Sequence, residues 1–132
     1  MKYDITVVGG GLAGSEAAYY LAKKGRKVRL VDIKPKAFTP AHKSGDYGEL
    51  VCSNSLKSND VYANACGLLK EEMRILGSLT MEAAAASSVP AGGALAVDRE
   101  KFAAYVTEKI KAEPNVTVIG KEYETVPDVS GD

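Results

Sequence analysis

Residues 3–14, YDITVVGGGLAG, decide how the fold of this chain is expected to begin. A β-branched run that ends in glycines is typical of a buried parallel strand followed by a tight turn. Residues 12–24, LAGSEAAYYLAKK, are rich in alanine and straight-chain residues, and Gly25 follows them. This composition predicts a helix that ends near the glycine. The first 25 residues are therefore expected to form a strand, a glycine turn and a helix.

The glycines at positions 9, 11 and 14 have the GxGxxG spacing of a dinucleotide-binding turn. In such a turn Gly9 permits the tight bend, Gly11 lets a pyrophosphate approach the backbone, and Gly14 allows close packing of helix on strand. The helix N-terminus then offers unpaired N–H groups and a partial positive charge to the phosphates. The alternative is a glycine-rich turn without a ligand. The residues predicted to contact the pyrophosphate are Gly9, Gly10, Gly11, Leu12, Ala13 and Gly14.

An acidic residue ends the next predicted strand. Residues 27–32, KVRLVD, alternate in polarity, and Asp32 follows Gly14 by 18 residues. A ribose-binding acid is expected roughly 20 residues after the glycines. We therefore expect Asp32 to bind the ribose hydroxyls.

The layout after Asp32 favours FAD over NAD, which the motif alone does not distinguish. A long irregular loop of about thirty residues and helical segments at 63–79 and 81–88 come before the predicted third strand at 115–119. This layout resembles that of glutathione-reductase-like FAD enzymes. The predicted fold class is α/β: an incomplete Rossmann-type FAD-binding domain with a parallel sheet and helices, formed by residues 1–132.

Two of the helices have clear patterns. In the first helical segment Leu68, Leu69, Met73 and Leu76 form a predicted apolar stripe, and Lys70 is expected to face solvent. In the segment 98–114, apolar residues recur every four positions, Asp98 is expected to cap the start and Pro114 to mark the exit. Residues 121–126, KEYETV, are expected to form an edge strand.

Composition excludes few classes of partner. Seventeen basic and seventeen acidic residues give a net charge of zero, so there is no polycationic footprint for nucleic acid. No apolar run approaches the roughly 20 residues of a membrane span, and the N-terminus lacks a signal peptide pattern. We expect a cytoplasmic protein whose two cysteines, Cys52 and Cys66, are free thiols.

Five segments, in order, carry a more specific resemblance: VVGGGLAGSEAAYYLAKKG, KPKAFTPAH, GELVCSNSLKS, GLLKEEMRILGSL and VPAGGALAVDREKF. They are similar to the N-terminal part of the folate- and FAD-dependent tRNA (uracil-5-)-methyltransferases. A related family is that of glucose-inhibited division protein A, which modifies the wobble uridine of tRNA and ranks second. The third hypothesis is a nucleotide-binding module without catalysis.

The resemblance implies an activity and its cofactors. Such an enzyme takes a one-carbon unit from methylenetetrahydrofolate, uses reduced FAD, and methylates C5 of the T-loop uridine of tRNA, with NAD(P)H as the reductant. Because members of the family are several times longer, this chain is expected to be an N-terminal fragment that is inactive alone. No metal site is expected, and the sequence does not indicate an oligomeric state.

The resemblance also assigns residues. Cys52 matches a thiol implicated in flavin or uracil chemistry, and the alternative is a buried structural cysteine. A second functional cysteine of the family would follow residue 132, and Cys66 is instead interpreted as a helix core residue. For His42 the alternatives are a flavin-contacting or proton-handling role and a local hydrogen bond. The remaining candidates for the flavin pocket, against simple turn or capping roles, are Ser53, Asn54, Ser55, Gly92 and Gly93.

Overall fold

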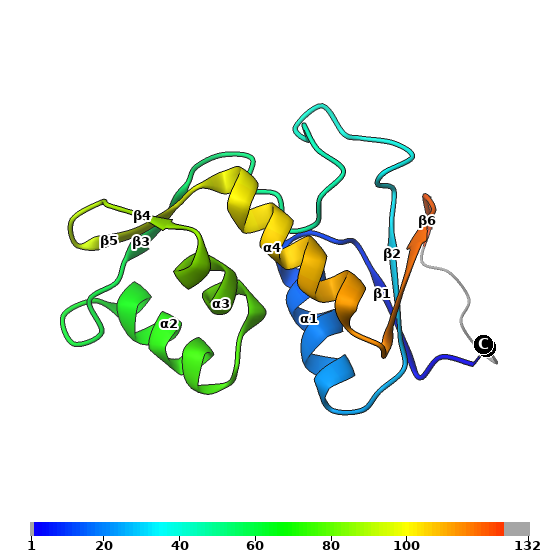
Figure 1. The fold of residues 1–132 in the computed structure, drawn as a ribbon, viewed down its shortest axis with the longest axis horizontal. Helices are drawn as coiled ribbons and strands as arrows, with labels where there is room; N and C mark the ends of the chain where they lie inside the picture. Colours follow the sequence, from blue (N-terminus) through cyan, green and yellow to red (C-terminus); the bar gives the residue numbers. More distant parts are fainter. Residues whose placement is uncertain (1, 126–132) are drawn as a thin grey trace.

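A computed structural model describes residues 2–125, and its larger sheet is parallel and three-stranded. The strands are β1 (Ile5–Val8), β2 (Val28–Asp32) and β6 (Val116–Gly120), in the order β1-β2-β6 (Figure 1). All three were expected from the sequence within one or two residues. Because β2 is central, Val28 and Leu30 are fully buried.

Helices α1 (Leu12–Lys23) and α4 (Arg99–Ala112) lie on the same side of this sheet (Figure 1). Their apolar residues join Val28 and Leu30 of β2 in one core cluster. The predicted cap of α4 is confirmed, because the Asp98 carboxylate accepts hydrogen bonds from the N–H groups of Glu100 and Lys101. The two helices contact each other as well as the sheet.

The segment of the chain between β2 and α4 forms a smaller unit. It contains an antiparallel sheet of β3 (Ser55–Ser58), β5 (Ala94–Val97) and β4 (Ser88–Val89). Helices α2 (Ala65–Ile75) and α3 (Leu79–Ala86) pack beside it (Figure 1). The predicted long loop is thus interrupted by β3, whose polar sequence SLKS gave no strand signal.

The predicted apolar stripe of α2 is wrong. Lys70 is only 6% exposed, whereas Leu69 is 57% exposed and Leu68 is also exposed. The Lys70 ammonium donates to the carbonyl oxygens of Ser58 (2.7 Å) and Cys66 (3.0 Å). The helix turns this face inward because Gly67 packs against the backbone of Asp60, where a Cβ would overlap the carbonyl.

An inter-helix cap joins α1 to α3. The Glu16 carboxylate accepts hydrogen bonds from the N–H groups of Leu79 and Thr80, both at 2.9 Å, and from the Ser78 hydroxyl at 2.7 Å. Burial alone would raise the pKa of this carboxyl, but the hydrogen bonds from Thr80, Ser78 and Leu79 outweigh it and lower the pKa. Glu16 therefore accepts hydrogen bonds from the N–H groups at the N-terminus of α3, which have no partner within that helix and lie 62 or more positions away in the sequence.

The end of the described chain differs from the expectation. Residues 121–125 form no strand, and Val126, the last residue of the predicted edge strand, lies outside the described residues. No helix in the described range is long and apolar enough to cross a membrane.

Candidate functional site

The glycine turn has the geometry that its spacing predicts. Gly9 has a φ of +102°, a conformation that favours glycine. A Cβ at Gly14 would overlap the carbonyl oxygen of Gly9, so helix α1 touches the turn directly. A Cβ at Gly11 would meet no protein atom within 4 Å, so its backbone is open to a ligand.

The N-terminus of α1 is free to bind an anion. The first N–H groups of an α-helix have no partner within the helix. No side chain caps α1 at Gly11, and its first turn carries no acidic residue. The helix therefore presents its N–H groups and its dipole to the space in front of Gly11.

Asp32 and the glycine turn are joined by a hydrogen bond. The N–H of Gly10 donates to Asp32 Oδ2 at 2.5 Å, and the N–H of Lys34 donates to Oδ1 at 2.8 Å. An ionised carboxylate has about four lone-pair sites, so each oxygen can still accept from a ribose hydroxyl. The structure thus brings Asp32 and the glycine turn together.

A segment to which the sequence analysis assigned no contact with the turn covers it. We call residues 46–49 the strap. The Tyr47 ring lies against Gly10, where a Cβ would overlap it, and the N–H of Gly48 donates to the Gly10 carbonyl at 2.8 Å. Burial, followed by the nearby Asp32 charge, raises the pKa of the Tyr47 hydroxyl. Gly10 is thus required by the protein's own packing.

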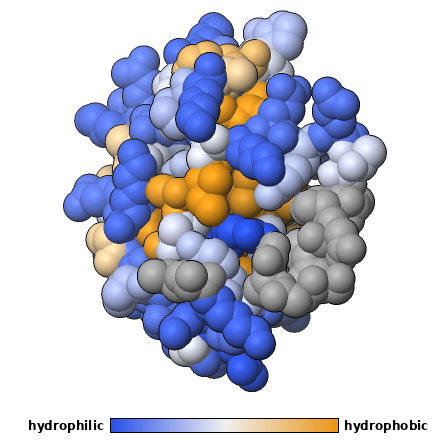
Figure 2. All heavy atoms as spheres, turned by 90° about the vertical axis from the view of Figure 1, so that its right-hand side faces the viewer, coloured by the Kyte–Doolittle hydropathy of each residue, from blue (hydrophilic) through white to orange (hydrophobic). Residues whose placement is uncertain are grey.

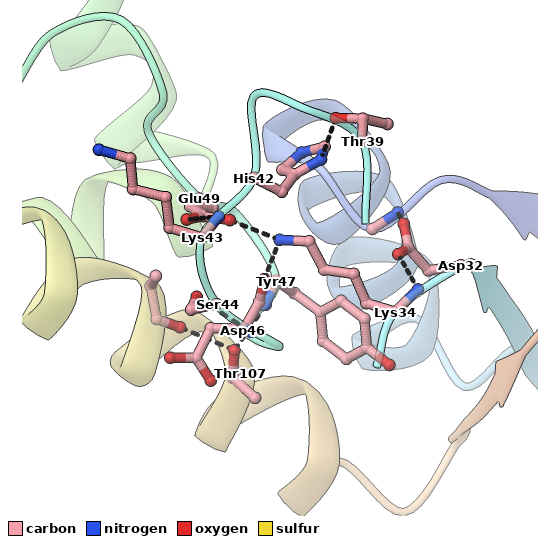
Figure 3. Close-up of polar contacts among 12 residues, drawn as sticks. Asp32, Lys34, Thr39, His42, Lys43, Ser44, Asp46, Tyr47, Glu49 and Thr107 are labelled. Atoms are coloured by element: carbon pink, nitrogen blue, oxygen red, sulfur yellow. Dashed lines mark hydrogen bonds and ion pairs between the residues drawn. The ribbon is translucent and has the colours of Figure 1, made fainter. Parts of the chain in front are cut away.

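A buried ion pair holds the strap to the end of β2 (Figure 3). Lys34 Nζ lies 2.8 Å from Glu49 Oε2 and donates to the Asp46 carbonyl at 2.7 Å. The side chains of Lys34 and Glu49 are only 4% and 13% exposed. Burial would raise the pKa of Glu49, but the hydrogen bonds from Lys34 and from the N–H of Lys43 outweigh it and lower the pKa. Sequence reasoning missed this pair because nothing local marks a contact across 15 positions.

Cys52 is exposed, so the interpretation as a buried structural cysteine is wrong. It lines a hollow of about 620 Å³ with Ser53, Asn54, Val97 and Arg99 among its neighbours. Neither Asp32 nor any of residues 9–14 lines this hollow in the described part of the chain. The structure therefore brings the glycines and Asp32 together and gives Cys52 a separate, accessible position after the strap.

The weaker candidates for the flavin site make mostly local contacts. His42 Nδ1 and Thr39 Oγ1 lie 2.6 Å apart in an exposed loop (Figure 3). Cys66 is partly buried in the first turn of α2 and is not a member of the core cluster, contrary to its expected position. Gly92, with a φ of +61°, and Gly93 belong to the turn before β5. The position of these residues gives no sign of a ligand.

The polar run after Cys52 starts a strand and caps no helix. The N–H of Ser55 donates to the Ser53 hydroxyl at 3.0 Å. The Asn54 carbonyl accepts from the N–H of Val97 at 2.9 Å. Ser53 and Asn54 line the hollow beside Cys52, whereas Ser55 begins β3.

Comparison with known proteins assigns the family. The family model described as glucose inhibited division protein A matches residues 4–131. The chain belongs to this family. A crystal structure of GidA from Aquifex aeolicus has a TM-score of 0.72 to this chain, with 19% identity over 92% of this chain and 20% of that one. The family fold and the parallel sheet of the structure confirm the predicted α/β FAD-domain class.

The chain is also similar to curated proteins that share one name. The chain is 57% identical to the methylenetetrahydrofolate–tRNA-(uracil-5-)-methyltransferase of Staphylococcus carnosus over 94% of its length. It is 59% identical to the protein of that name from Exiguobacterium sibiricum, also over 94% of its length. The chain spans 28% of the length of each relative. The resemblance predicted from the five segments is therefore confirmed for this part of the proteins.

Proposed function

We propose that this chain is the dinucleotide-binding part of an FAD-dependent tRNA methyltransferase. The observation that carries the proposal is the 57–59% identity, over almost the whole chain, to proteins named methylenetetrahydrofolate–tRNA-(uracil-5-)-methyltransferase. The reaction places a one-carbon unit from methylenetetrahydrofolate on C5 of a uridine in the tRNA T-loop. NAD(P)H serves as the reductant, and the protein works in the cytoplasm.

The residues of the glycine turn fit an FAD diphosphate. The N–H groups at Gly11, Leu12 and Ala13 would hold the pyrophosphate, because α1 has no side-chain cap and Gly11 faces open space. Asp32 would accept from the ribose hydroxyls while it keeps its bond to Gly10. When bound, the flavin supplies the electron chemistry of one-carbon reduction.

Cys52 is the candidate catalytic residue. A thiolate can add to C6 of a uracil ring and so make C5 nucleophilic, and it can also form a reversible adduct on a flavin. Cys52 is exposed and lines the hollow described above, which we call the Cys52 hollow, and this accessibility supports either role. The nucleotide half of the site and the thiol are thus two parts of one proposed machinery.

The test is methyl transfer by the full-length protein. Purified protein is incubated with FAD, NADPH, ¹⁴C-methylenetetrahydrofolate and a tRNA transcript, and label in the RNA is counted. A transcript with cytidine in place of the T-loop uridine is the matched control. Label only in the first transcript supports the proposal, and a protein that binds no flavin and transfers no label contradicts it.

The second candidate is wobble-uridine modification, which the family match favours. The same experiment separates the two. Nuclease fragments of the labelled tRNA locate the modified nucleotide in either the T arm or the anticodon arm. Label in the anticodon arm would replace the first proposal by the second.

A further inference from the structure

We propose that Lys34 and Glu49 are a positioning pair that couples occupancy of the dinucleotide site to the loop carrying Cys52. The inference rests on the proposed FAD site and on the proposed role of Cys52. It concerns two residues that contact each other and act through the strap.

The first step is the link between the site and Lys34. Both carboxylate oxygens of Asp32 accept from backbone N–H groups, one from Gly10 and one from Lys34. A ribose bound to Asp32 therefore adds hydrogen bonds to a carboxylate that already fixes the backbone of Lys34. Ligand binding at Asp32 stabilises this arrangement of the end of β2.

The second step is the link between Lys34 and the strap. The Lys34 ammonium donates hydrogen bonds to Glu49 Oε2 and to the Asp46 carbonyl, so it holds both ends of the strap (Figure 3). Glu49 Oε1 also accepts from the N–H of Lys43 at 2.9 Å. Because the pair is buried, removal of one partner leaves a charge without compensation, which loosens the strap.

The third step is the position of Cys52. It follows Glu49 by three residues, and the next backbone hydrogen bond to another element is that of the Asn54 carbonyl with Val97. Leu50 packs against the hydrophobic core, and residues 51–53 then lead from it to the end of β5. A change at Glu49 therefore alters how this segment presents the thiol.

ADP is the probe that separates this coupling from direct contact. It carries the ribose and diphosphate of FAD but no isoalloxazine ring, so it has no flavin that could cover Cys52 directly. The experiment uses full-length apoprotein and measures alkylation of the Cys52 peptide by iodoacetamide with mass spectrometry. ADP affinity is measured on the same samples by calorimetry.

We expect saturating ADP to slow alkylation of Cys52 in the parent protein by at least about fivefold, the low end of ordinary coupling between sites. In Glu49→Gln the effect of ADP falls to less than about twofold although ADP still binds. The matched control is Glu71→Gln, which removes the same charge from a half-exposed pair with Arg74, and it keeps the parent's ratio. Lys34→Met is the second variant and is used if Glu49→Gln does not fold.

Two results overturn the coupling and leave the proposed function intact. One is a parent protein that binds ADP with no change in Cys52 alkylation. The other is a Glu49→Gln protein, or Lys34→Met in its place, that retains the full effect of ADP. A parent that binds neither ADP nor FAD removes the proposed function and this inference together.

Discussion

At the scale of single residues, Gly14 and Gly11 separate the structural from the ligand-binding part of the turn. Gly14→Ala forces a methyl into the carbonyl of Gly9, and we expect the free energy of unfolding to fall by about 1–3 kcal/mol. Gly11→Ala meets no protein atom, so stability is unchanged while FAD affinity falls at least about tenfold. Urea unfolding of the apoprotein and FAD titration measure the two effects. Equal loss of stability in both variants would contradict the assignment.

Substitution of Cys52 should abolish activity and leave stability almost unchanged. Because the side chain is exposed, Cys52→Ala should change the free energy of unfolding by less than about 0.5 kcal/mol. FAD binding should be retained, and methyl transfer to the T-loop transcript should fall to background. Cys66→Ala is the control and should keep turnover. Normal turnover of Cys52→Ala would make its thiol dispensable.

The glycines and Asp32 were predictable from the sequence because the turn depends on backbone geometry over a few residues. Position 9 requires a positive φ, and position 14 has no room for a Cβ. Both requirements favour glycine, so they can be recognised in the sequence. Tyr47, Lys34 and Glu49 were missed, because each acts through a partner at least a dozen positions away. Ordinary loop residues carry no pattern that marks such partners.

At the scale of elements, Glu16 makes the packing of α1 and α3 depend on pH. We expect Glu16→Gln to lower the free energy of unfolding by about 1–2 kcal/mol at neutral pH, as for loss of a charged helix cap. The pKa of Glu16 is lower in the folded state, so its contribution is complete above the unfolded value of 4.5 and is lost as the pH falls through the folded pKa.

Urea unfolding of parent and variant between pH 7 and pH 3 measures this contribution. The difference between them should be constant down to about pH 5 and should shrink below it. Glu108→Gln, at an exposed position of α4, is the control and should lie close to the parent throughout. A difference that grows on acidification would contradict the cap.

Lys70 tests the unexpected orientation of α2. Lys70→Met removes the donor to the carbonyls of Ser58 and Cys66, and we expect a loss of about 1–3 kcal/mol in the free energy of unfolding. Lys101→Met, at a side chain that is 76% exposed, is the control and should be nearly neutral. Equal effects in thermal or urea unfolding would mean that Lys70 is solvated.

The elements show where sequence patterns fail. The strands β1, β2 and β6 and the helices α1 and α4 were predicted, because each repeats apolar residues at its own period or has a clear cap. The face of α2 was not, because its orientation depends on the close approach of Gly67 to Asp60. A hydrophobic period indicates a helix but does not decide which face tertiary contacts cover.

At the scale of the whole molecule, the two helices of residues 2–125 that pack on the parallel sheet, α1 and α4, lie on the same side of it. Residues paired in register lie on the same face, so Val8, Val31 and Ile119 form an apolar row opposite the helices. Val31 is buried between its neighbours, but Val8 is 55% exposed. Figure 2, which views the molecule from the sheet side, shows an apolar band among polar side chains. This face has the chemistry of a surface that further protein would cover.

The last prediction concerns the 132-residue chain taken alone. The glycine turn and Asp32 lie within it, but the chain spans 28% of the length of its curated relatives, and Val8 on one face of the sheet is 55% exposed. We therefore expect the isolated chain to give no methyl transfer to a T-loop transcript with FAD, NADPH and methylenetetrahydrofolate, whereas the full-length protein does. Because the Cys52 hollow is open, free thiol chemistry should persist, and iodoacetamide should still alkylate Cys52. Robust methylation by the isolated chain would show that these residues already contain the whole catalytic machinery.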